Sequence, residues 1–177
     1  MNRIVADPKK CVACRACELA CALAHAGTDD LVEAIYERGG RPRIYIESVG
    51  MLAVPLQCRH CDDAPCATVC PSGALWRPSP TEMVRVEQVK CIGCGYCVQA
   101  CPFGVILLGK FSPPDGSEER KAVVKCDLCT SRRAQGLPPA CVAACHVSAL
   151  RLEDDQSVAK ATRALAAAAV AAGIVDG

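Results

Sequence analysis

The residues best suited to chemistry in this sequence are its cysteines, which number 16 in a chain of 177 residues. They form four groups of four with none left over: Cys11, Cys14, Cys17 and Cys21; Cys58, Cys61, Cys66 and Cys70; Cys91, Cys94, Cys97 and Cys101; Cys126, Cys129, Cys141 and Cys145. A thiolate is a soft metal ligand, and two thiols can also pair as a disulfide. Four complete quartets favour four metal centres held by sulfur.

The third group lies in the run CIGCGYCVQACP, from Cys91 to Pro102. Three closely spaced cysteines, a fourth after a three-residue gap, and a proline are the spacing of bacterial [4Fe-4S] ligation, in which the fourth cysteine serves the other cluster of a pair. We expect this fourth cysteine on a short helix that faces away from the loop. The pattern therefore predicts clusters that come in pairs.

The other three groups are variants of this run. The first, CVACRACELAC, lacks the proline; the second, CRHCDDAPCATVCP, has a middle gap of four residues; and the fourth has eleven residues between Cys129 and Cys141. Three groups lead into related text, CPSGAL, CPFGVI and CHVSAL, which predicts a turn followed by a short apolar strand. The sequence is an internal repeat, and it predicts four [4Fe-4S] clusters.

Disulfides and zinc are the alternative uses of these cysteines. The segment MNRIVADPKK before Cys11 leaves no room for an export signal, so we expect a cytoplasmic protein, in which thiols stay reduced. Paired CxxC units can hold zinc, but a zinc pair uses only two cysteines from each unit. Zinc gives no reason for the third cysteine or for the two Cys-Pro endings, whereas iron–sulfur ligation explains both.

Residues 5–152 resemble the four-cluster, ferredoxin-like electron-transfer subunits of multisubunit oxidoreductases. The likeness is carried by PLQCRHCDDAPCATVCPSGAL, from Pro55, and by VKCDLCTSRRAQGLPPACVAAC, from Val124. His146 departs from the proline often found at its position. Members of this family serve dimethyl sulfoxide reductase and formate dehydrogenase, as beta-type subunits, and some hydrogenases, carbon monoxide dehydrogenases and tungsten aldehyde oxidoreductases. The resemblance implies an electron-transfer subunit and leaves its substrate open.

The resemblance also implies a nested pairing of the groups, first with fourth and second with third. In the outer pair, one cluster would be held by Cys11, Cys14, Cys17 and Cys145, and its neighbour by Cys21, Cys126, Cys129 and Cys141. In the inner pair, one cluster would be held by Cys58, Cys61, Cys66 and Cys101, and its neighbour by Cys91, Cys94, Cys97 and Cys70. The resulting line of four clusters would be a conduit for single electrons.

These ligands need short elements to position them, and we expect an α+β fold. It would consist of two nested ferredoxin-like dicluster modules, with short β-hairpins and helices around four cubane clusters. The four-cluster domain is expected over residues 1–152, with an inner module at about 53–108 and an outer module from 1–30 and 120–152. Residues 153–177 are expected to form an Ala-rich C-terminal helix.

Local patterns predict the connecting elements. Apolar and β-branched residues predict short strands over 43–50 and 51–56, over 83–89, and over 105–111 and 121–126. Thr28 is the expected N-cap of a scaffold helix that extends to Arg38.

Composition narrows the function further. Aromatic residues make up only 3% of the chain, so clusters would fill an interior that large side chains usually occupy. The formal charge of +1 counts every thiol as neutral, whereas sixteen thiolates around four oxidised cubane cores bring it to about −7. This charge argues against nucleic-acid binding. The apolar run over 164–175 is too short for a transmembrane segment, but its smooth surface suits docking on its own core, a partner or another copy.

Polar residues near the ligands are candidates for tuning cluster potentials. Four arginines are expected to stabilise reduced clusters, with solubility as their simpler role: Arg15, Arg59, Arg132 and Arg133. His60 and His146 adjoin ligands and could act by hydrogen bonding. Since sixteen thiolates already complete four ligand sets, we expect no histidine to bind iron.

The sequence contains no signature of a catalytic site. The glycines of CIGCGYC belong to a cluster loop, and no P-loop or catalytic triad is present. We expect a non-catalytic subunit that relays electrons between a catalytic oxidoreductase subunit, with a molybdenum or tungsten cofactor, and a second redox subunit. The alternatives are a freely diffusing polyferredoxin, a partner of hydrogenase or carbon monoxide dehydrogenase, and a zinc-stabilised interaction module. Self-association remains open.

Overall fold

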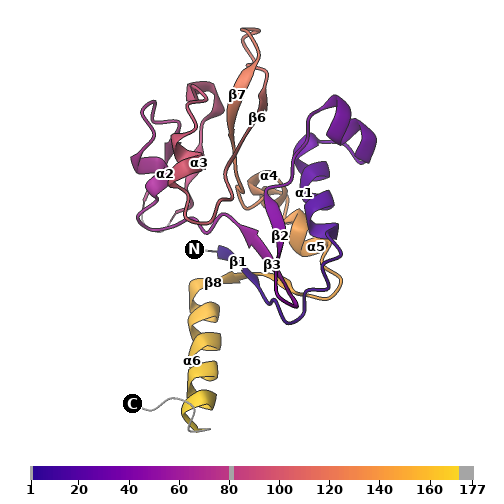
Figure 1. The fold of residues 1–177 in the computed structure, drawn as a ribbon, viewed down its shortest axis with the longest axis vertical. Coiled ribbons are helices and arrows are strands. Elements are labelled where there is room, and N and C mark those ends of the chain that lie inside the picture. Colours follow the sequence, from indigo (N-terminus) through magenta and orange to yellow (C-terminus); the bar gives the residue numbers. More distant parts are fainter. Residues whose placement is uncertain (1, 80–81, 172–177) are drawn as a thin grey trace.

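The computed structural model describes residues 2–79 and 82–171 of the chain. It is a small α+β protein of short antiparallel hairpins and short helices, as predicted (Figure 1). The strands are β1 (Asn2–Ala6), β2 (Ile44–Val49), β3 (Leu52–Gln57), β4 (Leu75–Trp76), β5 (Arg85–Val86), β6 (Leu107–Phe111), β7 (Arg120–Val124) and β8 (Leu150–Asp154). The helical elements are α1 (Ala16–Ala26), η1 (Glu33–Glu37), α2 (Pro65–Thr68), η2 (Gln88–Lys90), α3 (Tyr96–Ala100), α4 (Thr130–Ala134), α5 (Ala140–Ala143) and α6 (Asp155–Ala171).

The strands pair two by two in antiparallel fashion. The hairpins β2–β3 and β6–β7 confirm the strands predicted on either side of their turns. The stretch 83–89 contributes only the two residues of β5, which pair with β4. The strands β4, β6 and β8 follow the second, third and fourth cysteine groups, so the predicted turn-and-strand repeat is confirmed.

The pairing of β1 with β8 joins the beginning of the described chain to its last strand. The register runs from Asn2 opposite Asp154 to Ala6 opposite Leu150. The buried Gln57 amide donates to the carbonyl oxygen of Ile4 at 2.8 Å, which ties β3 to β1. Segments more than 140 residues apart thus form one unit.

Cysteines and small aliphatic residues share the core. One packed cluster combines cysteines of the first, second and fourth groups with Ile4, Ile44, Ile46 and Leu150. A second combines cysteines of the second and third groups with Leu75, Val84, Ile106 and Val123. In Figure 1, α2 and α3 lie on one side of the β6–β7 hairpin, whereas α1, α4 and α5 lie on the other.

The helix predicted over residues 28–38 differs from the structure. Asp30, rather than Thr28, caps the segment, because its Oδ1 accepts from the backbone N–H groups of Val32 and Glu33 at 2.8 and 3.0 Å. The turn then widens into the π-helix η1. Ala34 alone among the apolar residues of this segment is buried, so little of its apolar surface reaches the core.

Helix α6 extends away from the rest of the molecule (Figure 1), and none of its side chains is buried. Of the three docking possibilities, packing on its own core is limited to the start of α6, where the half-buried Val158 lines a recess with Ile4 and Leu128. The rest of the expected tail, residues 172–177, lies outside the described residues. Among the described helices, none has the length and apolar character needed to cross a membrane.

Candidate metal centres

The four cysteine groups share one backbone feature. The residue before the second cysteine of each group adopts a left-handed conformation, with φ values of 57°, 50°, 71° and 55°, at Ala13, His60, Gly93 and Leu128. The backbone N–H groups of Gly93 and Leu128 donate to the Sγ atoms of Cys91 and Cys126, both at 3.4 Å. Left-handed backbone costs a non-glycine residue about 1–2 kcal/mol and concentrates at functional sites. The four loops therefore share the same bend before the second cysteine.

Among the four residues at this bend, only Gly93 is a glycine. A Cβ at this position would lie 2.8 Å from the carbonyl oxygen of Lys121. The third loop therefore needs glycine for its contact with β7 as well as for its φ angle.

The third cysteine of each group is the second residue of a helix: Cys17 in α1, Cys66 in α2, Cys97 in α3 and Cys141 in α5. The fourth cysteines differ from expectation. Only Cys21 lies within a helix, because α2, α3 and α5 end before their fourth cysteine. Those three helices have only four or five residues, and the chain turns directly into the following strand.

The second and third groups exchange cysteines across two recesses. One recess is lined by Cys70 together with Cys91, Cys94 and Cys97. The other is lined by Cys101 together with Cys58, Cys61 and Cys66. Apolar side chains such as Leu75, Val123 and Ile106 complete the walls. We call the second and third groups, with α2 and α3, the inner region.

The first and fourth groups meet through α1 and α5, which pack against each other. We call these groups, with α1, α4 and α5, the outer region. Cys17, Cys21, Cys126 and Cys141 are buried in one core cluster, and Cys11 and Cys145 pack against it. Cys129 is also buried, whereas Cys14 is exposed. The structure therefore packs most of the outer cysteines together. Unlike the inner region, it shows no described recess there that is lined by one complete set of four cysteines.

Burial disfavours the charged thiolate form of these cysteines when no metal is bound. It raises the pKa of Cys17 and Cys66 to about 11 and that of Cys126 to about 12. Burial and then the neighbouring Cys126 and Cys21 raise the pKa of Cys141 still further above its ordinary value. Positive charge at the same place would reverse this effect, since metal ligation deprotonates a thiol.

The donor set fits [4Fe-4S] clusters, which four thiolates hold. None of the sixteen cysteines is joined in a disulfide in this structure, so all are available as ligands. His60 adds a second indication, because it is only 1% exposed and neither ring nitrogen makes a hydrogen bond of good geometry with the described residues. A buried donor of this kind needs an acceptor, such as a cluster sulfide.

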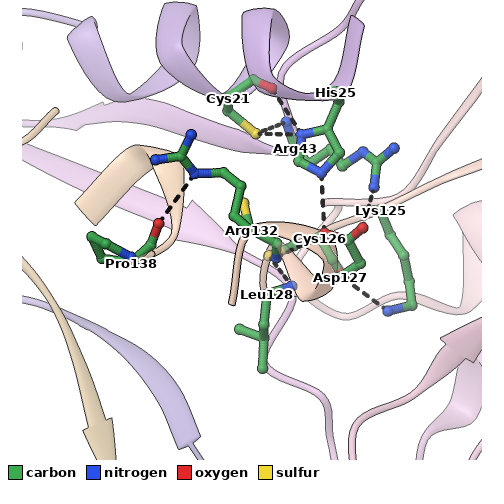
Figure 2. Close-up of polar contacts among 10 residues, drawn as sticks. Cys21, His25, Arg43, Lys125, Cys126, Asp127, Leu128, Arg132 and Pro138 are labelled. Atoms are coloured by element: carbon green, nitrogen blue, oxygen red, sulfur yellow. Dashed lines mark hydrogen bonds and ion pairs between the residues drawn. The ribbon is translucent and has the colours of Figure 1, made fainter. Parts of the chain in front are cut away.

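A network of charged residues surrounds Cys21 in the outer region (Figure 2). His25 Nε2 donates to Asp127 Oδ1 at 3.0 Å, and Arg43 donates to Asp127 Oδ2 at 3.0 Å. The backbone N–H of Cys129 also donates to Asp127 Oδ1, at 2.9 Å. The backbone N–H of Arg43 donates to Cys21 Sγ at 3.3 Å. The network thus connects two cysteines of different groups.

Both nitrogens of His25 face acceptors, because Nδ1 lies 2.8 Å from the Cys21 carbonyl oxygen. Burial alone would lower the pKa of His25, but its hydrogen bonds to Asp127 and Cys21 raise it to about 9. Hydrogen bonding from His25 and the charge of Arg43 outweigh burial and hold the pKa of Asp127 well below its usual range. Ligand atoms of His25, Asp127 and Cys129 lie within 4.8 Å of one another. The ion pairs of Asp127 with His25 and Arg43 already explain why these side chains lie together.

This network was not predicted from the sequence. His60 and His146 were the histidines expected near the ligands, whereas His25 contacts a cysteine sulfur, at 3.6 Å from Cys21. The available signal was the i,i+4 spacing of Cys21 and His25 on one helix face. The partner Asp127 is 102 residues away, and no local pattern indicates it.

The four arginines singled out from the sequence have different contacts. Arg15 pairs with Glu18 at 3.2 Å, and Arg59 lies over the Phe103 ring at 5.9 Å from its centroid. Arg132 donates to the carbonyl oxygen of Pro138 at 3.2 Å and so braces the eleven-residue gap of the fourth group. Arg133 is half-buried, and His146 is exposed.

Comparison with known proteins places these features in a family. The model of the 4Fe-4S dicluster domain matches residues 49–155. An iron-sulfur protein of Rhodospirillum rubrum is 43% identical over 156 residues, which cover 85% of this chain and 81% of that protein. The electron transport protein HydN of Escherichia coli K12 is 39% identical, covering 85% of this chain and 87% of HydN. The probable anaerobic dimethyl sulfoxide reductase chain YnfG of the same organism is 35% identical, covering 92% and 78%.

Proposed function

This chain belongs to the 4Fe-4S dicluster domain family of iron–sulfur proteins, and we propose that it holds four [4Fe-4S] clusters and relays single electrons through them. The observation that carries this proposal is the fourfold repeat of one cysteine loop, with the same left-handed bend before each second cysteine. Two clusters would leave eight of sixteen thiols without a role. The relatives named as iron-sulfur and electron transport proteins agree with a carrier that has no catalysis of its own.

The ligand sets follow the nested scheme. Cys58, Cys61, Cys66 and Cys101 would hold one inner cluster, and Cys91, Cys94, Cys97 and Cys70 the other. Cys11, Cys14, Cys17 and Cys145 would hold one outer cluster, and Cys21, Cys126, Cys129 and Cys141 the other. The two inner recesses and the packing of α1 on α5 support this scheme.

When bound, each cluster accepts or gives one electron without making or breaking a bond to a substrate. The residues of the chain hold the clusters at fixed positions, exclude water from most of them and set their electrostatic surroundings. Cys14 and Cys94 are the two exposed cysteines. Their loops also expose Val12 and Ile92. We assign these loops as the places where electrons enter and leave.

The proposed partners are a catalytic oxidoreductase subunit, with a molybdenum or tungsten cofactor, and a second redox subunit. Similarity to YnfG, a probable dimethyl sulfoxide reductase chain, supports the molybdenum or tungsten partner. Similarity to HydN supports electron transport without naming a partner. We propose a cytoplasmic location, because cysteines that serve as cluster ligands need a compartment that keeps them from pairing as disulfides.

Isolation of the native complex without oxygen tests this function. We expect iron and sulfide in this chain together with molybdenum or tungsten in a partner that remains bound through size-exclusion chromatography. Nickel in the partner would instead identify hydrogenase or carbon monoxide dehydrogenase. Purification of the iron-loaded chain alone would favour a diffusing polyferredoxin and contradict the stable complex.

A further inference from the structure

Lys125 is a buried cation between β7 and the fourth cysteine group. The residue is only 2% exposed. Its Nζ donates to the carbonyl oxygen of Cys126 at 2.9 Å, which Figure 2 shows. This is its one hydrogen bond within residues 2–79 and 82–171, and no carboxylate there forms an ion pair with it. An ammonium group has three donors, so Lys125 is under-satisfied.

The other cations nearby have their own anions. Arg43 pairs with Asp127 at 3.0 Å, and Arg77 pairs with Asp62 at 2.9 Å. A buried charge is strongly unfavourable unless it is paired. Lys125 is therefore the buried cation whose compensating negative charge must come from something other than these carboxylates.

Cysteines of two groups pack together next to Lys125, because Cys126, the following residue, shares a core cluster with Cys58 of the second group. A recess lined by Cys58, His60 and Leu128 brings the second loop against the fourth loop. Val84 lines the recess of Cys58, Cys61, Cys66 and Cys101, and it also lines a second recess together with Lys125. Lys125 is thus one side chain away from the second group while it is hydrogen-bonded to the fourth.

We propose that Lys125 is a positioning residue that electrostatically links the inner and outer regions, as the shared counter-charge of the cluster bound by Cys58, Cys61, Cys66 and Cys101 and the cluster bound by Cys21, Cys126, Cys129 and Cys141. The inference rests on the proposed function. Four thiolates around an oxidised cubane core carry a net negative charge of about two. Two such neighbours oppose the addition of an electron to either, and a cation between them reduces that opposition.

If both ligand sets hold clusters, an electron passing between them would oxidise one and reduce the other, with no bond made or broken. A positive charge at Lys125 would favour the reduced form of both clusters. We expect a smaller effect of Lys125 on the clusters of the other two ligand sets.

Three substitutions separate charge from hydrogen bonding. Lys125→Met removes both, Lys125→Gln keeps a donor for the Cys126 carbonyl, and Lys125→Arg keeps the charge. Lys160→Met is the matched control, because it removes a lysine charge from exposed helix α6. Each holoprotein is first analysed for iron and sulfide and then titrated electrochemically, with the reduced clusters followed by electron paramagnetic resonance.

We expect lower midpoint potentials for two of the four clusters in K125M and K125Q, and wild-type potentials in K125R and K160M. Wild-type potentials in iron-replete K125Q would overturn the inference, because a purely structural lysine needs only its hydrogen bond. If K125M loses iron, K125Q decides the outcome. Absence of clusters from the wild-type protein would instead overturn the proposed function.

Discussion

The inner and outer regions use the same cysteine loop in different surroundings. In the inner region, the recesses around the cysteines are walled by aliphatic side chains such as Leu75, Ile106 and Val123. In the outer region, Cys21 lies against the ion pairs of His25, Arg43 and Asp127. Cluster potential depends on hydrogen bonds to sulfur and on nearby charge. The comparison shows that the cysteine loop is common to both regions, whereas the charged and apolar side chains that would tune a bound cluster differ.

The regions also differ in how far apart in the sequence their contacting elements lie. The inner helices and strands lie close together in sequence, between β3 and β7. The outer region depends on α1 meeting α5 and on β1 pairing with β8. The outer region therefore forms only when both ends of the chain come together.

The largest expected effect tests the exchange of cysteines in the inner region. Cys97→Ala should remove one cluster, or about four of about sixteen iron atoms. The double variant C70A/C97A should lose no more, because both cysteines belong to one ligand set. The matched variant C66A/C97A should lose about eight, and iron and sulfide analysis distinguishes the two. Equal losses from the two double variants would contradict the exchange.

Asp127→Asn should weaken the outer region selectively. The substitution removes the carboxylate that pairs with Arg43 and His25. We expect it to lower the free energy of unfolding by about 1–2 kcal/mol, less than for a fully buried pair because the Asp127 side chain is 40% exposed. Release of iron in urea should then be about 5- to 30-fold faster. The control Asp115→Asn lies in the exposed loop between β6 and β7 and should release iron at the wild-type rate. Similar rates for both variants would show that the network does not stabilise the outer region.

The same network predicts a dependence on pH. The pKa of His25 is raised from 6.5 to about 9 in the folded chain. Its contribution to stability is therefore complete below pH 6.5 and is lost as the pH rises through 9. The free energy of unfolding should fall by about 1–2 kcal/mol over that window. The fall is smaller than for a fully buried pair because Asp127, the partner of His25, is partly exposed. Resistance to urea at pH 6 and pH 9.5 measures this fall, and a His25→Gln variant with an unchanged fall would contradict it.

The smallest effect is expected from helix α6, which belongs to neither region. A chain that ends at Asp154 should keep all its iron and lose less than about 1 kcal/mol of stability, since no α6 side chain is buried. Any loss of partner binding in this truncated chain would identify α6 as a docking element. A loss of iron would show that the outer region depends on it.

The sequence allowed prediction of features that local spacing controls. The cysteine groups, the β2–β3 and β6–β7 hairpins and the strand after each Cys-Pro or Cys-His turn follow from residues close together in the chain. The nested ligand sets, the domain boundaries and the tuning roles of the four arginines stay predictions.

Other features depend on contacts that local patterns do not contain. The pairing of β1 with β8 and the contact of His25 with Asp127 join distant segments. The left-handed conformations of Ala13 and Leu128 were also unpredictable, because neither residue favours them and the surrounding loop imposes them. The π-helical turn η1, found where an α-helix was expected, was likewise not indicated by the local sequence.

The most direct test of the account is the iron and acid-labile sulfide content of this chain, purified without oxygen. Four clusters predict about sixteen iron and about sixteen sulfide per chain, divided equally between the inner and outer regions. About eight of each would contradict the account by leaving one region without clusters. Zinc in place of iron would contradict it completely.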